Sequence, residues 1–176
     1  MNTFAVELWD NEGHKCSFYT VRQDDAAENE TDKFFNKYDG IPEFKNTTRQ
    51  LLSFILDSIG DDHGAVDQLF NRFENEVVGL PDRGKVTLGG IAFLYPEFPL
   101  RLYALRVRNR SDIVILFNGG VKSSWTNQGS KDILMKWRDA CKFAERIEEA
   151  LRNGEIVVDE SARKILTDTG DEEILL

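Results

Sequence analysis

The stretch from Pro99 to Trp125 constrains the fold more than any other part of this chain. Residues 100–107 are rich in strand-forming side chains with arginines between them, and residues 113–117 read Ile-Val-Ile-Leu-Phe. A near-continuous apolar run of that kind is typical of a strand buried on both faces. Because only the polar residues 108–112 separate the two runs, the sequence predicts an antiparallel β-hairpin at the centre of a sheet.

The segments on either side of this hairpin supply further strands and the helices that cover a sheet. Alternating apolar residues predict two opening strands, and apolar residues spaced by three and four predict four helices. The predicted strands are 3–9 and 16–21, and the predicted helices are 31–40, 47–59, 66–76 and 131–152. Further short elements are a strand at 85–88 or 91–94, a strand at 155–158 and a small helix around 162–166. The expected fold is α+β, with a small, mainly antiparallel sheet covered by helices.

The length and composition fit a single domain. The chain has 176 residues, of which 41% are hydrophobic, enough for a proper core. We expect residues 1–158 to form the domain and residues 159–176 to be a partly mobile C-terminal extension. No apolar run approaches the roughly 18 residues of a membrane span, and the N-terminus lacks the apolar region of a signal peptide. Cys16 and Cys141 are far apart in sequence and are expected to stay free thiols, so the expected location is the cytoplasm.

Charge is spread unevenly along the chain. The net charge is −9, which taken alone argues against a nucleic-acid-binding protein. Residues 99–138, however, contain eight Lys and Arg against two Asp and Glu, a net charge of +6. For binding a polyanion, the local field matters more than the total charge. Two interpretations stay open: a footprint for a polyanion, or cations that neutralise acidic surface of the same fold.

The first strand of the hairpin gives a sharper hypothesis. Its apolar residues change from even to odd positions near Ala104 and Leu105, which suggests a one-residue bulge there. Such a bulge would bring four side chains to one face, namely Arg101, Tyr103, Arg106 and Arg108. A row of this kind could bind phosphates and stabilise the charge of a phosphorane transition state. The alternative is a partly exposed strand whose arginines pair with acidic helices.

The sequence lacks the motifs of common enzyme classes. The segment from Gly119 to Ser123 resembles the end of a phosphate-binding loop but lacks the first glycine at the required distance. There is no nucleophile elbow, no zinc-protease motif and no dinucleotide-binding motif. His14 and Cys16 have no third metal ligand at a recognisable spacing, and no nucleophile motif accompanies His63. We therefore expect no metal and no cofactor, and any chemistry must come from scattered residues.

The hairpin and its surroundings resemble a known family. An opening strand, a helical pair, the sequence Leu-Arg-Leu-Tyr-Ala-Leu-Arg, then Ile-Val-Ile-Leu-Phe-Asn-Gly-Gly-Val-Lys-Ser-Ser and a terminal helix are similar to the RelE/HigB-type toxins of bacterial toxin-antitoxin systems. The likeness covers mainly residues 99–151. It implies a small sheet with helices on one face. It also implies a metal-independent endoribonuclease that acts on messenger RNA, often at the ribosome, and that a partner antitoxin holds inactive.

The resemblance also assigns roles to residues. The matching basic positions are Arg101, Arg106 and Lys122, which would bind the scissile phosphate and assist attack by the 2′-hydroxyl, with Tyr103 as a proton donor or stacking group. The remaining candidates for nucleic-acid binding are Arg108, Arg110, Ser123, Ser124 and Lys131. The expected partners are an antitoxin of helix-turn-helix type that covers the basic hairpin, and messenger RNA or the ribosome. If these side chains are exposed, Arg106→Ala and Lys122→Ala should abolish activity and leave the fold intact.

A second function from another class is compatible with the same residues. The hairpin could belong to a non-catalytic module of a phage or defence system that binds a protein or a nucleic acid. A small neighbouring gene for a helix-turn-helix protein would favour the toxin, whereas an isolated gene or a phage or defence operon would favour the binding module.

Overall fold

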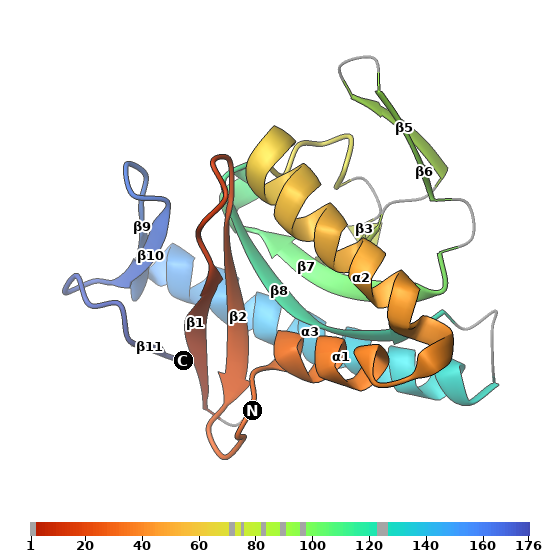
Figure 1. Ribbon diagram of the computed structural model, residues 1–176. Coiled ribbons are helices and arrows are strands. Elements are labelled where there is room, and N and C mark those ends of the chain that lie inside the picture. The colour runs from red at the N-terminus through yellow and green to blue at the C-terminus, as the bar shows by residue number, and fades with distance from the viewer. Residues whose placement is uncertain are drawn as a thin grey trace.

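The computed structural model describes residues 3–70, 73–74, 76–81, 84–88, 91–95, 98–122 and 127–176. At its centre is a seven-stranded sheet with the order β11-β1-β2-β8-β7-β4-β3 (Figure 1). These strands are β1 (Phe4–Asp10), β2 (Ser17–Gln23), β3 (Phe73–Glu74), β4 (Val77–Leu80), β7 (Leu100–Arg106), β8 (Ile113–Val121) and β11 (Ile174–Leu175). Every neighbouring pair is antiparallel except β2 and β8, which are parallel. The expected α+β fold with a mainly antiparallel sheet is confirmed, and so is the central hairpin of β7 and β8.

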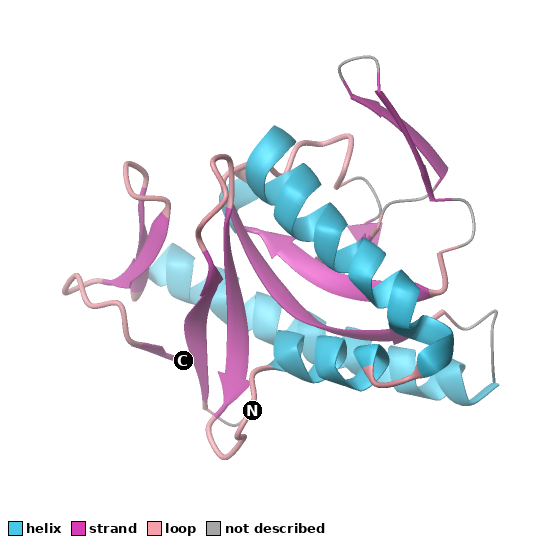
Figure 2. Ribbon diagram, in the orientation of Figure 1, coloured by secondary structure: helices cyan, strands magenta, loops and turns pink. Residues whose placement is uncertain are grey.

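Helices cover both faces of this sheet (Figures 1 and 2). The first face packs against α1 (Glu30–Asp39) and against α2 (Lys45–Ser53), which continues as the π-helix η2 (Phe54–His63). The second face packs against the long helix α3 (Asn127–Asn153). The resemblance implied helices on one face only, so the second layer is a difference. No helix within the described ranges has both the length and the apolar character needed to cross a membrane.

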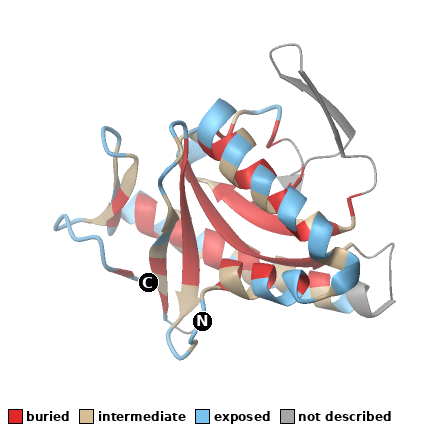
Figure 3. Ribbon diagram, viewed as in Figure 1, coloured by how far each residue is buried: buried red, intermediate tan, exposed pale blue. Residues whose placement is uncertain are grey.

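The two helical layers explain the apolar pattern of the hairpin. Leu100, Leu102 and Ala104 of β7 pack under α1 and α2, whereas Tyr103 and Leu105 pack under α3. Strand β7 therefore alternates regularly, and apolar residues occur at both parities because both faces are buried (Figure 3). An irregularity does occur beside Ala104, between Leu102 and Ala104, but the prediction placed the extra residue on the wrong strand. The irregularity lies on β8, where three steps from Gly119 to Leu116 oppose two steps from Leu102 to Ala104.

Several smaller elements differ from their predictions. The third predicted helix, 66–76, is absent, because residues 67–69 form turns and residues 73–74 form β3. The small helix predicted around 162–166 is a turn followed by strand β10 (Lys164–Thr167), which pairs with β9 (Ile156–Asp159). The C-terminal tail includes β11, which pairs with β1 at the edge of the sheet. In residues 73–74 and 164–167, pairing with a strand close in sequence, β4 or β9, decides the structure rather than local helical periodicity.

Other predicted elements are confirmed. The long helix after the hairpin is α3, and the two candidate strands at 85–88 and 91–94 both exist, as the hairpin of β5 (Gly84–Leu88) and β6 (Ile91–Tyr95). Both cysteines are free thiols. Cys16 is fully buried, and burial raises the pKa of its thiol to about 12.

Candidate nucleic-acid interface at the carboxyl end of β8

The parallel pair of β2 and β8 creates a position where open sheets often bind ligands. The chain leaves β2 towards α1 on one face of the sheet and leaves β8 towards α3 on the other face. When two adjacent parallel strands send their following helices to opposite faces, a crevice opens at their carboxyl ends. In this fold, the carboxyl ends of the two parallel strands are Gln23 of β2 and Val121 of β8.

Strand β8 continues for five residues beyond its last pair with β2, at Leu116. Side chains of α1 bond to its backbone there in place of a neighbouring strand. The Thr31 hydroxyl lies 3.1 Å from the carbonyl oxygen of Leu116 and 3.2 Å from that of Phe117, and it donates to this pair at the irregularity of β8. At the end of the strand, the Tyr38 hydroxyl forms a hydrogen bond with the Val121 backbone. The edge of β8 is thus satisfied by side chains of a helix.

A buried carboxylate organises the middle of this edge. Glu30 is only 4% exposed, and its Oε2 accepts a 3.0 Å hydrogen bond from the Asn118 amide. Its Oε1 accepts from Lys33 Nζ at 2.8 Å and from Gln23 Nε2 at 3.4 Å. Asn118 Oδ1 in turn accepts from the Gly119 N–H at 2.8 Å. Because each polar group has a partner, the cluster holds the exit of β8 in a single conformation.

Helices α1 and α3 meet across this exit. Lys37 Nζ of α1 lies 3.5 Å from Asp132 Oδ2 of α3. The same Asp132 oxygen lies 3.3 Å from the position that a Cβ atom on Gly120 would take. Gly120 is opposite Arg101 in the β7–β8 ladder, so Arg101 borders the same place from the side of β7. Here a cation from β7 lies beside an ion pair that joins the two helical layers.

Three of the predicted site residues gather at this end of the hairpin. Arg101 is at the start of β7, and the Lys122 backbone N–H donates to the Pro99 carbonyl oxygen at 2.8 Å. Lys131 precedes Asp132 on α3 and is exposed. Helix α1 adds two further cations, because Lys33 pairs with Glu30 and Lys37 pairs with Asp132. The predicted residues Ser123 and Ser124 lie outside the described ranges.

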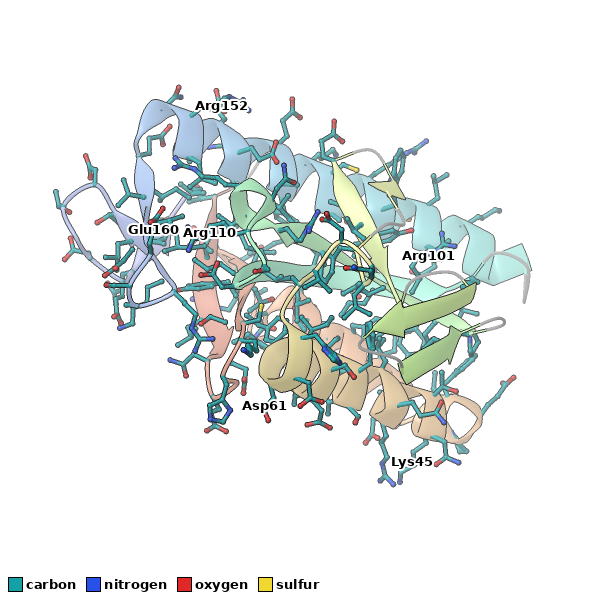
Figure 4. All side chains as sticks on the ribbon, turned by 90° about the horizontal axis from the view of Figure 1, so that it is seen from above. Lys45, Asp61, Arg101, Arg110, Arg152 and Glu160 are labelled. Carbon is teal, nitrogen blue, oxygen red and sulfur yellow. The ribbon has the colours of Figure 1, made fainter. Side chains whose placement is uncertain are left out.

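The other arginines lie elsewhere, so the predicted row on one face is wrong. Arg106 is five residues from Arg101, or about 17 Å along an extended strand. In the regular alternation of β7, residues five apart also point to opposite faces. Figure 4 shows Arg101 and Arg110 at opposite ends of the hairpin. Tyr103 is 1% exposed in the core beneath α3, where it cannot reach a substrate.

Arg106 has a structural role on the face covered by η2. Its Nη1 donates to Asp67 Oδ1 at 2.7 Å and to the Ala65 carbonyl oxygen at 3.1 Å, and its guanidinium lies 5.6 Å from the centre of the Phe70 ring. Only 8% of its side chain is exposed. The expectation of an exposed Arg106 is therefore wrong, because its guanidinium is buried by hydrogen bonds to Ala65 and Asp67 in the loop after η2.

We expect Arg106→Ala to destabilise the protein rather than to leave the fold intact. The substitution removes a charged donor from a buried carbonyl and uncovers the ring of Phe70, which should lower the free energy of unfolding by about 1–3 kcal/mol. Urea denaturation would measure the loss. The matched control is Arg49→Ala on α2, whose exposed side chain lies 3.8 Å from Asp39 and should matter by less than about 0.5 kcal/mol. Equal effects of the two variants would contradict the anchoring role.

Arg108 and Arg110 are also bound within the fold. Arg108 has a φ of 52° in the hairpin turn, and its Nη2 donates at 3.2 Å to the Leu151 carbonyl oxygen in the last turn of α3. A cation there complements the helix dipole. Arg110 forms a bidentate pair with Asp112, at 2.8 and 2.7 Å, and lies 3.1 Å from Glu160, beside which Figure 4 shows it. The hydrogen bond to Asp112 raises the pKa of Arg110. Both residues therefore have partners within the fold, and their assignment to nucleic-acid binding stays a prediction.

Metal ligation is a separate question. Across the described ranges, no three His, Cys, Asp or Glu side chains gather in a way that could hold a metal ion. His14 Nδ1 is in contact with Asp61 Oδ1 at the surface, and this hydrogen bond lowers the pKa of Asp61.

Sequence analysis missed the contribution of α1 to the site. Glu30, Lys33 and Asn118 were not candidates, because each one alone is an ordinary surface type. The available signal was the spacing of Lys33 and Lys37, which places both cations on one side of a helix. Comparisons with family models, with curated proteins and with solved structures found no match for this chain.

Proposed function

We propose that the chain is an RNA-cleaving toxin of a toxin-antitoxin system, with its RNA site at the carboxyl end of β8. The observation that carries the proposal is that Arg101, Lys122 and Lys131 lie at the same end of the hairpin, where Lys37 of α1 pairs with Asp132 of α3. Lys33 and Lys37 add positive charge from α1. Cations at the rim of a crevice attract phosphates even when the total charge of a protein is negative.

The chemistry needs few groups from the protein. In metal-independent cleavage, the 2′-oxygen of a ribose forms a bond to the adjacent phosphorus and gives up its proton to water. The bond from phosphorus to the 5′-oxygen of the next nucleotide breaks, and this oxygen takes up a proton from water. Negative charge builds up on the phosphoryl oxygens in the transition state. Arg101 would bind these oxygens with its planar guanidinium, and Lys122 would add a second charge. A partner antitoxin would inhibit the protein by covering these cations.

The test compares controlled expression of the wild-type chain with Arg101→Ala/Lys122→Ala. Growth arrest and cleavage of cellular RNA are expected from the wild type and should be lost in the double variant. The matched control is Lys45→Ala/Lys142→Ala, which removes the same charge from exposed positions of α2 and α3. Thermal melting of the purified proteins must show that the variants fold.

Binding of the purified protein to a labelled oligoribonucleotide separates the possible outcomes. Loss of two phosphate contacts should reduce the slope of log affinity against log salt concentration by about 1.4. An unchanged slope would contradict direct phosphate contacts by Arg101 and Lys122. RNA binding without cleavage or arrest would favour a non-catalytic nucleic-acid-binding module, and folded wild-type protein with neither property would overturn the proposal.

A further inference from the structure

The outer edge of β1 has pairing groups that β11 fills only in part. Strand β11 pairs with Ala5 and Val6, and Phe4 exchanges two backbone hydrogen bonds of 2.9 Å with Leu176. Among the strands in the described ranges, none pairs with this side of β1 from Glu7 to Asp10. Pairing of β1 with β2 is regular from Phe4 to Leu8. Since alternate residues of an antiparallel strand turn their peptide groups to the same side, the N–H and C=O of Leu8 face this open edge.

A pocket of about 460 Å³ lies along the open part of the edge. Figure 1 shows β11 beside β1 near the C-terminus, and residues of both strands line the pocket. Its lining comes from residues 5–8 of β1, from Arg22 of β2 and from residues 172–175. Two of its apolar side chains are open to solvent, because Leu8 is 48% exposed and Leu175 is 64% exposed. The pocket thus combines unpaired strand backbone with exposed apolar surface, as sites for strand addition do.

The charges of the pocket indicate what can bind there. Its lining contains three carboxylates, from Glu7, Glu172 and Glu173, against the single guanidinium of Arg22. Arg22 Nε lies 2.7 Å from Glu7 Oε1, and Glu172 pairs with Lys164. Glu173 is exposed and forms no ion pair in the described part of the chain. A second copy of this acidic chain would bring like charges together, whereas a basic segment would complement the pocket.

We propose that the open edge of β1 binds an extended segment of a partner protein in which apolar residues alternate with Lys or Arg. The segment would add as a strand, with its backbone bonded to Leu8. Because side chains alternate along a strand, the apolar set would lie on the face of Leu8, while the basic set would lie on the face of Glu7 and Glu173. This site is separate from the proposed RNA site at the carboxyl end of β8 and does not depend on the proposed RNA cleavage.

The test uses amide NMR spectra of the ¹⁵N-labelled full chain titrated with a synthetic peptide of alternating valine and lysine. Resonances of residues 7–10 and 172–175 are expected to shift. A peptide with glutamate in place of lysine should not shift them, because it adds like charge to the pocket. Leu8→Pro should abolish binding, since it removes only an N–H that points away from β2.

A second pair of variants keeps the test decisive even if Leu8→Pro does not fold. Leu8→Lys should lower the affinity for the valine-lysine peptide by about tenfold, because it places a positive charge beside the lysines of the peptide. Val157→Lys, at an exposed apolar position of β9, should leave the affinity unchanged. Equal binding of the glutamate peptide, shifts confined to other regions, or equal effects of the two lysine variants would overturn the proposal. A dimer of the wild-type protein in analytical ultracentrifugation that becomes a monomer in Leu8→Lys would also overturn the proposal, because the edge would then bind a second copy of the chain.

Discussion

Gly119→Ala is expected to destabilise the protein by about 3 kcal/mol, near the upper end of what overpacking costs. A Cβ atom at this position would lie 1.8 Å from the Arg101 carbonyl oxygen and 2.9 Å from the Leu102 Cα atom. These are backbone atoms of the neighbouring strand, so no side-chain rotation can relieve the overlap. Strands β7 and β8 would have to separate at Arg101 and Leu102. Thermal denaturation would show the loss as a large fall in Tm.

Gly40→Ala is the matched control for this prediction. Gly40 has a φ of −77° at the end of α1, and the nearest atom to an added Cβ lies 3.4 Å away. Because alanine fits this conformation and restricts the unfolded chain, the change should be neutral or should stabilise by about 0.4–1 kcal/mol. Similar losses from both variants would mean that the close approach of β7 to β8 does not limit the residue at position 119.

Glu30→Ala is expected to lower the free energy of unfolding by about 2–3 kcal/mol. The substitution leaves the buried Asn118 amide without its 3.0 Å acceptor and takes the 2.8 Å partner of Lys33 away. An unsatisfied buried donor costs more than a hydrogen bond contributes when it is made. Chemical denaturation measures the loss, and the NMR signal of the Asn118 side-chain amide should shift because its environment changes.

Two further variants distinguish the contribution of the buried Glu30–Asn118 hydrogen bond from that of the partly exposed Glu30–Lys33 ion pair. Glu30→Gln keeps an acceptor oxygen for Asn118 and should recover part of the stability. Lys33→Met keeps the aliphatic stem of a side chain that is 34% exposed and should cost less than about 1 kcal/mol. If Lys33→Met were as damaging as Glu30→Ala, the ion pair rather than the bond to Asn118 would hold the exit of β8.

Local pattern was sufficient to predict the hairpin of β7 and β8 and the long helix α3, because each has a strong period of its own. It was insufficient to predict which side chains of β7 point to which face of the sheet, because a strand buried on both faces has apolar residues at both even and odd positions. Arg106 and Arg110 looked like surface cations, yet their partners Asp67 and Asp112 are ordinary acidic residues with no motif. The site at β8 depends on the parallel partner β2, and no local signal announces which strand pairs with which.

The parallel pairing of β2 with β8 has a consequence for how the chain folds. Ser17 pairs with Ile113, which is 96 residues later, and Ala5 pairs with Leu175 at the end of the chain. Contacts between residues so far apart require closure of long loops and slow the search for the native state. During synthesis, the first hairpin and α1 therefore cannot complete their packing until β8 has been synthesised, and their apolar surface stays exposed until then. We expect the N-terminal half of this chain to need its C-terminal half before it becomes resistant to proteolysis.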